Sequence, residues 1–223
     1  MSILEQVVRI FAPLSCIGCG TEQDVLLCDS CAQGLETVVP RCYRCKRATF
    51  GFSVCADCQP TTPLRSVVVG YEFDGLAKDL VHRIKYERAQ AGTGEIARLI
   101  SALSGNLPEG AVLVSIPTAS SRVRARGYDH TALLTRALAQ KTGRRSARLL
   151  GRRGQAHQVG SGRTRRLSQL SGAYYAIRPE AVEGRHLVLV DDILTTGATL
   201  ETAAHMLLQA GARRVDAIVF AQA

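Results

Sequence analysis

The sequence predicts an α/β protein, a mostly parallel sheet with helices on both faces, preceded by a small cysteine-rich domain. Two observations predict this architecture. All eight cysteines fall within residues 16–58, and residues 63–223 alternate short apolar runs with helical patterns. Strands that alternate with helices favour parallel pairing in a sheet covered on both faces. The stretch Pro60-Thr61-Thr62-Pro63 separates the two parts, which gives domains of residues 1–62 and 63–223.

The first residues favour a short helix, because Leu4, Val7, Val8 and Phe11 recur at helical spacing. The same stretch lacks the basic n-region of a signal peptide and carries Glu5 inside what would be its apolar part. No run reaches the roughly 18 apolar residues of a membrane span. We therefore expect a cytoplasmic protein without membrane insertion.

The cysteines form four Cys-x-x-Cys pairs. These are Cys16 with Cys19, Cys28 with Cys31, Cys42 with Cys45, and Cys55 with Cys58. Each such turn directs two thiolates at one tetrahedral ion, and two turns complete the closed four-sulfur shell of structural zinc. The spacing predicts a double zinc ribbon with two structural Zn²⁺ ions. Disulfides are the alternative, but a reducing compartment favours metal.

The pairing of the cysteine turns stays open at this point. Sequential pairing closes each ribbon locally, whereas a crossed arrangement joins the first turn with the third and the second with the fourth. The segment is too short to build an apolar core of its own, so its fold should depend on the metal. Its main core candidates are Val25, Leu26, Leu27, Val38 and Val39.

The second domain shows five apolar runs and four helical patterns. Strands are predicted at residues 67–73, 111–116, 147–150, 187–190 and 215–220, and helices at residues 76–85, 96–103, 133–138 and 200–208. The last helix has the clearest stripe, with Leu200, Ala203, Ala204 and Leu207 on one side and Gly211 placed to end it.

The strand at residues 187–190 runs into two adjacent carboxylates, Asp191 and Asp192. Ligands of α/β sheets bind beyond the carboxyl ends of strands, so both side chains are expected at an exposed strand end. A loop rich in amide and hydroxyl donors follows, at Thr195, Thr196, Gly197, Ala198 and Thr199. A loop that leads into a helix binds phosphate, and carboxylates accept ribose hydroxyls or hold Mg²⁺. A pentose 5-phosphate satisfies both ends, whereas a solvated strand end with a helix cap is the plainer alternative.

The stretch from Val190 to Thr199, VDDILTTGAT, resembles the signature by which type I phosphoribosyltransferases bind phosphoribosyl pyrophosphate (PRPP). Combined with the cysteine pairs, Ile84-Lys85-Tyr86, Ser115-Ile116-Pro117 and Arg126-Gly127-Tyr128, it resembles the ComF family of competence-associated, phosphoribosyltransferase-like proteins. The resemblance covers nearly all 223 residues. It implies a type I phosphoribosyltransferase-like sheet after the double zinc ribbon, PRPP with Mg²⁺ as ligand, a role in DNA uptake, and other competence proteins as partners.

The resemblance also implies roles for individual residues. Asp191 and Asp192 would meet the ribose hydroxyls as the catalytic carboxylates, and Thr195 to Thr199 would hold the 5-phosphate. The pyrophosphate side would comprise Thr118, Ala119, Ser120, Ser121, Arg122 and Arg126. A hood that closes over the site would span residues 158–169 and include Gln158, Arg163 and Arg166.

The chain departs from the family pattern near the acceptor. The family often reads Arg-Gly-Phe-Asn-Gln where this chain has Arg126-Gly127-Tyr128-Asp129-His130, and Arg-x-x-Asn where it has Arg166-Leu167-Ser168-Gln169. These departures leave the acceptor open. His130 is interpreted either as a cap or surface residue or as a general base near the pyrophosphate end.

Positive charge is concentrated in a basic block from Arg122 to Arg166, which holds thirteen Lys or Arg and a single acid, Asp129. A diphosphate needs only a few cationic groups. The surplus can bind single-stranded DNA through its phosphates, and a solvated arginine-rich face is the alternative. Tyr128 is the only aromatic residue of the block, which argues against base stacking.

Two classes of function remain. The first is an enzyme that transfers a phosphoribosyl group from PRPP and releases pyrophosphate. The second is a non-catalytic, single-stranded-DNA-binding competence factor for which PRPP or a nucleotide is a regulatory ligand. A purely structural zinc adaptor would leave the stretch from Asp191 to Thr199 unexplained.

Overall fold

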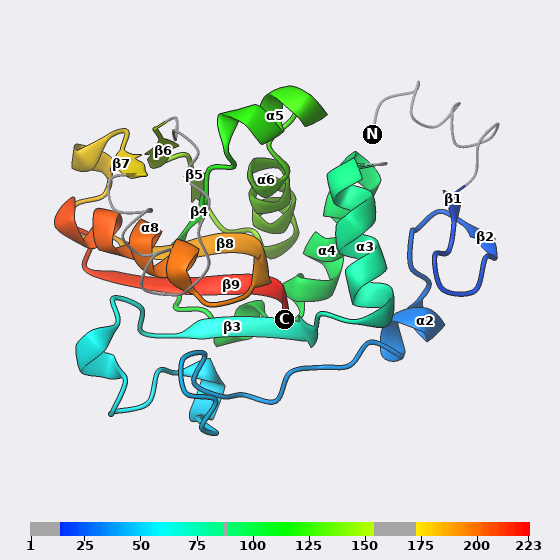
Figure 1. The fold of residues 1–223 in the computed structure, drawn as a ribbon, viewed down its shortest axis with the longest axis horizontal. Coiled ribbons are helices and arrows are strands. Elements are labelled where there is room, and N and C mark those ends of the chain that lie inside the picture. Colours follow the sequence, from blue (N-terminus) through cyan, green and yellow to red (C-terminus); the bar gives the residue numbers. More distant parts are fainter. Residues whose placement is uncertain (1–13, 87–88, 154–172) are drawn as a thin grey trace.

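A computed structural model describes residues 14–86, 89–153 and 173–223 (Figure 1). The expected N-terminal helix with Leu4 to Phe11, and the expected hood residues Gln158, Arg163 and Arg166, lie outside these ranges. Within the described ranges, the helices are too short or too polar to cross a membrane.

Five parallel strands form the central sheet, in the order β3-β9-β8-β4-β5. Their bounds are Val67–Glu72 for β3, Val112–Ser115 for β4, Ser146–Ala147 for β5, His186–Leu194 for β8 and Arg214–Gln222 for β9. Every residue of β4 is buried, as are all but the first of β9. Such burial is typical of a parallel sheet with helices on both faces, and it confirms the predicted fold class.

Within the part of the chain that the structure describes, four longer helices connect the strands of the sheet. Helices α3 (Gly75–Tyr86) and α4 (Ala89–Ser101) lead from β3 to β4, α6 (His130–Thr142) from β4 to β5, and α8 (Ala198–Gln209) from β8 to β9. The connection from β8 to β9 crosses the sheet in the opposite direction to the connections from β3 to β4 and from β4 to β5. Because such crossovers are right-handed, α8 covers one face, while α4 and α6, which pack against each other, cover the other.

The structure differs from the predicted elements in two places. The strand expected at residues 147–150 is split between β5 and β6 (Leu150–Arg152), which pairs antiparallel with β7 (Tyr174–Ala176) in a separate hairpin. Helix α5 (Ser120–Arg126) was not predicted, because it is short and buries none of its residues, so it has no apolar stripe. Single 3₁₀ turns occupy Phe50–Phe52, Gln59–Thr61, Ser104–Asn106 and Pro179–Ala181.

The cysteine-rich segment runs along two sides of the sheet domain (Figure 1). Its first half, with β1 (Leu14–Ser15), β2 (Glu22–Gln23) and α2 (Asp29–Gln33), lies beside α3, and its second half lies beneath β3. Between the halves, residues 36–38 follow the outer edge of β3, where the Val38 amide donates to the Gly70 carbonyl. Leu26, Leu27 and Val38 are buried as expected, whereas Val39 is 72% exposed and was wrongly placed in the core.

Candidate functional site

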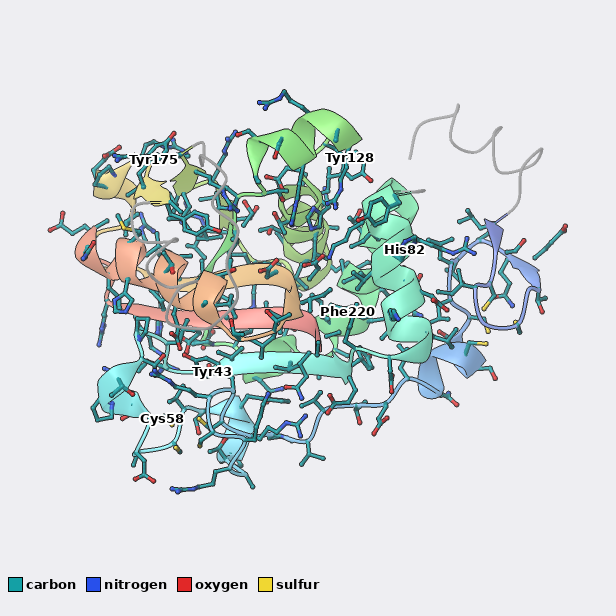
Figure 2. The ribbon with its side chains drawn as sticks, in the orientation of Figure 1. Tyr43, Cys58, His82, Tyr128, Tyr175 and Phe220 are labelled. Atoms are coloured by element: carbon teal, nitrogen blue, oxygen red, sulfur yellow. The ribbon has the colours of Figure 1, made fainter. Side chains whose placement is uncertain are left out.

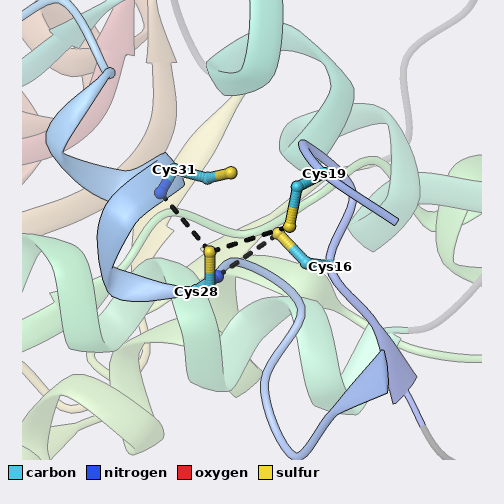
Figure 3. A group of neighbouring side chains, drawn as sticks. All are labelled: Cys16, Cys19, Cys28 and Cys31. Carbon is cyan, nitrogen blue, oxygen red and sulfur yellow. Dashed lines mark hydrogen bonds between the residues drawn. The ribbon is translucent and has the colours of Figure 1, made fainter. Parts of the chain in front are cut away.

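The eight cysteines gather into two groups of four, each with its sulfur atoms within 4.8 Å of one another. Cluster 1 contains Cys16, Cys19, Cys28 and Cys31, and cluster 2 contains Cys42, Cys45, Cys55 and Cys58. The pairing is therefore sequential, one of the two arrangements that the sequence left open. Figure 3 shows the side chains of cluster 1 converging from the β1–β2 region and α2.

Both clusters fit a zinc ion. Four sulfurs about 2.3 Å from one tetrahedral ion lie about 3.8 Å from one another. The Sγ atoms of Cys19 and Cys28 are 4.0 Å apart, and those of Cys45 and Cys55 are 3.5 Å apart. Backbone amides also point at the sulfurs, since the Cys28 amide donates to Cys16 Sγ at 3.4 Å. Burial would raise the pKa of Cys16, but these amides outweigh it and lower that pKa to about 6.

The carboxyl ends of β4 and β8 meet at one edge of the sheet. The two strands are neighbours, and Ser115 is in register with Val190. The chain leaves β4 toward β5 and leaves β8 toward β9, so the strand order reverses between them. Open α/β sheets bind their ligands at such a switch point. The geometry therefore brings the loop after β4 and the predicted PRPP stretch to the same end of the sheet.

Asp192 is a buried member of β8, with 6% of its surface exposed. Its Oδ2 lies 2.6 Å from Nζ of Lys85, at the end of α3, and 3.2 Å from Nε2 of His130. Burial alone would raise the pKa of Asp192, but the His130 hydrogen bond and the Lys85 charge hold it well below its usual range. The expectation of two carboxylates at an exposed strand end was therefore wrong for Asp192, because β8 continues to Leu194.

Asp191 differs from Asp192 in its burial and in the direction of its pKa shift. Its side chain is half-buried, and Oδ1 accepts the Asp192 backbone amide at 2.9 Å. Burial raises the pKa of Asp191 well above its ordinary value, and the negative charge of Asp192 raises it further. The two adjacent carboxylates thus have opposite pKa shifts, and a cation or hydroxyl donor at Asp191 would relieve an unfavourable charge.

His130 is 5% exposed, so its interpretation as a surface residue was wrong. The helix cap is its neighbour Asp129, whose carboxylate accepts the amides of Thr131 and Ala132. Arg126 Nη1 lies 3.4 Å from His130 Nδ1. A carboxylate can only accept, so Nε2 of His130 carries the proton that it donates to Asp192. His130 therefore positions Asp192 from the start of α6.

The loop after β4 is tied to the same network. The Thr118 hydroxyl donates to Asp129 Oδ1 at 2.9 Å, and its amide lies 3.3 Å from Oδ2. Burial would raise the pKa of Asp129, but hydrogen bonds from Thr131 and Thr118 outweigh it and lower that pKa. The family departure at Asp129 thus supplies an anion that orients the backbone of the loop.

The other residues of the expected pyrophosphate side do not form an open loop. Ala119 precedes α5, and Ser120, Ser121 and Arg122 form its exposed first turn. Arg126, at the end of α5, places its guanidinium carbon 5.2 Å from the centre of the Tyr86 ring. The C-terminal end of α5 therefore packs against the end of α3, whereas its first turn is exposed.

The expected phosphate loop, residues 195–199, leads directly into α8. Gly197 caps the helix in the left-handed region, at φ 78°, and the Thr196 hydroxyl lies 3.4 Å from the Ala198 amide. Gly197 and Ala198 are buried, whereas Thr195 is exposed. The amides of the first turn of α8 thus start next to the end of β8, where the helix dipole favours an anion.

Known proteins resemble this chain in sequence and fold. Residues 135–223 match the phosphoribosyl transferase domain family. A solved glutamine PRPP amidotransferase from B. subtilis, complexed with ADP and GMP, is 19% identical over 63% of this chain and 30% of that chain, with a TM-score of 0.45. The DNA utilization protein YhgH of Salmonella typhi is 30% identical over 200 residues, 85% of this chain and 87% of that protein. The competence protein ComFC of Bacillus subtilis (strain 168) is 30% identical over 202 residues, 84% of this chain and 80% of that protein. The chain belongs to the ComF family.

One arginine of the basic block of this ComF-family protein is engaged within the fold. Arg144 donates to three backbone carbonyls, of Pro108 at 2.7 Å, Ser104 at 3.2 Å and Leu107 at 3.3 Å. This arginine fastens the turn before β4. The sequence analysis counted Arg144 among the charges available to a polyanion. Its carbonyl partners lie 36 to 40 residues away in the sequence, so no local pattern indicates its structural role.

The β6–β7 hairpin supplies aromatic residues to the same block. The guanidinium carbon of Arg152 lies 5.5 Å from the centre of the Tyr174 ring, and that of Arg153 lies 5.8 Å from the Tyr175 ring. Tyr174 is buried and Tyr175 is 40% exposed. Figure 2 labels Tyr175 at the β6–β7 hairpin. In contrast, Tyr128 donates its hydroxyl to the Ile84 carbonyl at 2.8 Å. Aromatic residues outside the block in sequence therefore lie beside it in space.

Sequence reasoning assigned no role to Lys85. The motif Ile84-Lys85-Tyr86 contributed to the family resemblance, but it lies more than 100 residues before Asp192. The available signal was a single lysine at the end of a predicted helix. A lysine at such a position is ordinarily solvated and lies at the C-terminal end of the helix dipole.

Proposed function

We propose that this ComF-family protein binds PRPP with Mg²⁺ in the crevice beyond β4 and β8, and transfers its phosphoribosyl group with release of pyrophosphate. One observation carries the proposal. A pair of carboxylates at the end of β8 stands immediately before the N-terminus of a twelve-residue helix, at the switch point of the sheet. A sugar phosphate uses the carboxylates and the helix amides at once.

Each part of the ligand has a matching part of the site. The 5-phosphate is held by amides and hydroxyls of residues 195–199, and the ribose hydroxyls donate to Asp191. Asp192 keeps its ion pair with Lys85 and orients the end of β8. Thr118 to Arg122 and Arg126 face the pyrophosphate, and the family resemblance assigns Gln158, Arg163 and Arg166 to the hood. Bound Mg²⁺ supplies positive charge to the leaving pyrophosphate.

The direct test is calorimetry with PRPP and Mg²⁺. Asp191→Asn keeps the shape of the side chain and removes its charge, so PRPP affinity should fall about tenfold or more, as expected for loss of charge-assisted hydrogen bonds. Asp79→Asn, which changes an exposed carboxylate on α3, is the matched control and should bind as the wild type does. Equal affinity in both variants would place the ligand elsewhere.

Turnover needs its own measurement, because binding alone fits a regulatory ligand as well. Pyrophosphate release would be followed with PRPP, Mg²⁺ and a panel of bases and amines. Release that requires an acceptor and is lost in Asp191→Asn supports the transferase. Tight binding without release from any acceptor would favour the non-catalytic competence factor.

A second candidate function is binding of single-stranded DNA, together with other competence proteins. The β6–β7 hairpin favours it, because arginine beside an exposed tyrosine combines phosphate neutralisation with base stacking. The competence and DNA-utilization names of the relatives support the same context.

The salt dependence of single-strand binding tests this candidate. Arg152→Ser with Arg153→Ser should lower the log–log salt slope by about 0.7 for each phosphate that the variant no longer neutralises. Tyr175→Ser should weaken binding by about 1–3 kcal/mol and leave the slope nearly unchanged, since stacking involves no counterions. Binding no tighter than that of a neutral polymer at low salt would remove the candidate.

A further inference from the structure

Tyr43 links cluster 2 to the start of α8. It lies within the first cysteine turn of that cluster, between Cys42 and Cys45, and 5% of its surface is exposed. Figure 2 labels Tyr43 between the segment beneath β3 and the sheet domain. A tyrosine in a short, metal-dependent turn is thus buried against a different part of the molecule.

The hydroxyl of Tyr43 fixes a buried carboxylate of α8. It donates to Oε1 of Glu201 at 2.7 Å, and it also forms a hydrogen bond with the Thr62 hydroxyl. Glu201 is 3% exposed and lies in the first turn of α8, and Nε of Arg44 lies 3.9 Å from the same oxygen. Because a buried carboxylate needs donors, the cysteine turn and the first turn of α8 constrain each other.

The ring of Tyr43 lies against the backbone of the phosphate loop. A Cβ placed on Gly197 would come within 2.8 Å of Cε2 of Tyr43. Gly197 therefore satisfies two demands, the left-handed φ of 78° and the close approach of the ring. Any displacement of the ring would change the support beneath the amides that begin α8.

Cluster 1 contacts other parts of the sheet domain. A Cβ on Gly18 would lie 3.3 Å from Cδ1 of Leu76 on α3, and Asp29 Oδ1 lies 3.1 Å from Nη1 of Arg98 on α4. The two clusters have the same four-sulfur chemistry and sequential pairing. Cluster 1 is therefore a matched control for any effect transmitted by cluster 2.

We propose that cluster 2 positions the phosphate loop through Tyr43, so that metal at Cys42, Cys45, Cys55 and Cys58 sets the affinity of the loop for a sugar phosphate. An ion holds four thiolates in one tetrahedron and thereby fixes the turn that carries Tyr43. Without it, the turn loses its main rigid constraint and the ring no longer supports Gly197. Tyr43 is thus a positioning residue. The inference rests on the proposed function for its PRPP readout alone.

Two full-length variants separate the clusters. Cys45→Ser and Cys19→Ser each replace the exposed cysteine of one cluster. Elemental analysis would establish that each variant has lost one zinc, and the substituted cysteine identifies the cluster concerned. Amide hydrogen exchange of residues 195–201, measured without PRPP, should quicken in Cys45→Ser and match the wild type in Cys19→Ser. PRPP affinity should fall at least about fivefold in Cys45→Ser, the lower end of usual couplings between sites.

Substitutions at Tyr43 test whether the effect of cluster 2 on the phosphate loop passes through this residue. Tyr43→Phe keeps the ring on Gly197 and should retain most of the affinity and slow exchange, whereas Tyr43→Ala should reproduce Cys45→Ser with both zinc ions bound. Equal effects of the two cysteine variants, or unchanged exchange in both Cys45→Ser and Tyr43→Ala, would overturn the inference. If the wild type binds no PRPP, the proposed function fails, and the exchange measurement still decides whether cluster 2 orders the loop.

Discussion

Nζ of Lys85 lies 2.6 Å from Oδ2 of Asp192, which joins the last turn of α3 to the end of β8. The side chains are 21% and 8% exposed, so the pair is shielded from solvent. Neither partner can lose its counterion without leaving a charge in a poorly solvated site. The relationship connects two segments that are far apart in sequence at the edge where the ligand is expected.

Lys85→Met should destabilise the protein strongly. Removing one member of a buried ion pair leaves the other uncompensated, which costs about 3–5 kcal/mol. Urea denaturation would measure the change in the free energy of unfolding. Lys78→Met, on the exposed face of the same helix, is the control and should stay within about 0.5 kcal/mol of the wild type. Similar values for both variants would show that Asp192 does not depend on Lys85.

Asp191→Asn and Asp192→Asn should shift stability in opposite directions at pH 7. The pKa of Asp192 is lowered on folding, so its ionised form stabilises the protein above its unfolded pKa, and its loss is destabilising. The pKa of Asp191 is raised on folding, so its ionised form is unfavourable and its removal is stabilising.

Urea denaturation midpoints measured over a range of pH would check the predictions for Asp191→Asn and Asp192→Asn. As the pH falls through the raised pKa of Asp191, the wild-type carboxyl takes up a proton, and the advantage of Asp191→Asn should shrink. The contribution of Asp192 should persist until the pH approaches its unfolded pKa, about 3.9, and then decline through its lower folded pKa. A loss of stability in Asp191→Asn at pH 7 would contradict the assignment of the two roles.

Protein purified under reducing conditions should hold two zinc ions per chain, one in each cluster. Cys31→Ser or Cys58→Ser should each lower the count toward one. Strong chelators should remove both ions and loosen the cysteine-rich segment, because the fold of such small units depends on the metal. Elemental analysis with a thiol assay would distinguish this outcome from disulfides, which would leave no zinc and no free thiols.

Arg144→Met should lower the free energy of unfolding by about 1–3 kcal/mol, because it leaves the carbonyls of Ser104, Leu107 and Pro108 without this donor. The salt slope of single-strand binding should stay near the wild-type value. Arg145→Met, at the exposed neighbouring position, should leave stability nearly unchanged. A large change of slope in Arg144→Met would return this residue to the DNA-binding surface.

The sheet and the cysteine sites follow well from sequence because their signals are local. Apolar runs mark the strands through burial on both faces, and the spacing within each cysteine turn fixes the direction of two thiolates. The sequence does not decide how pairs combine, since both pairings satisfy the same local geometry. In the structure, the two cysteine turns within each half of the segment lie close together, so the pairing is sequential.

The residues that surround the candidate site could not be predicted as easily, because their partners are distant in sequence. Asp192 is buried only because Lys85 and His130, from two helices, neutralise and orient it. Helix α5 buries no residue, and nothing in its composition distinguishes it from a loop. Polar groups that satisfy one another across the fold leave no periodic pattern in the chain.

Strand β3 stands at one end of the sheet order, and a backbone segment from the cysteine-rich region covers its outer side. The Val38 amide donates to the Gly70 carbonyl, and the Glu72 amide donates to the Glu36 carbonyl. An uncovered edge of this kind recruits strands from other molecules and leads to aggregation. A phosphoribosyltransferase-like domain cut out at Pro63 would expose that edge, and we expect it to self-associate. We therefore expect the cysteine-rich segment also to keep the sheet from polymerising.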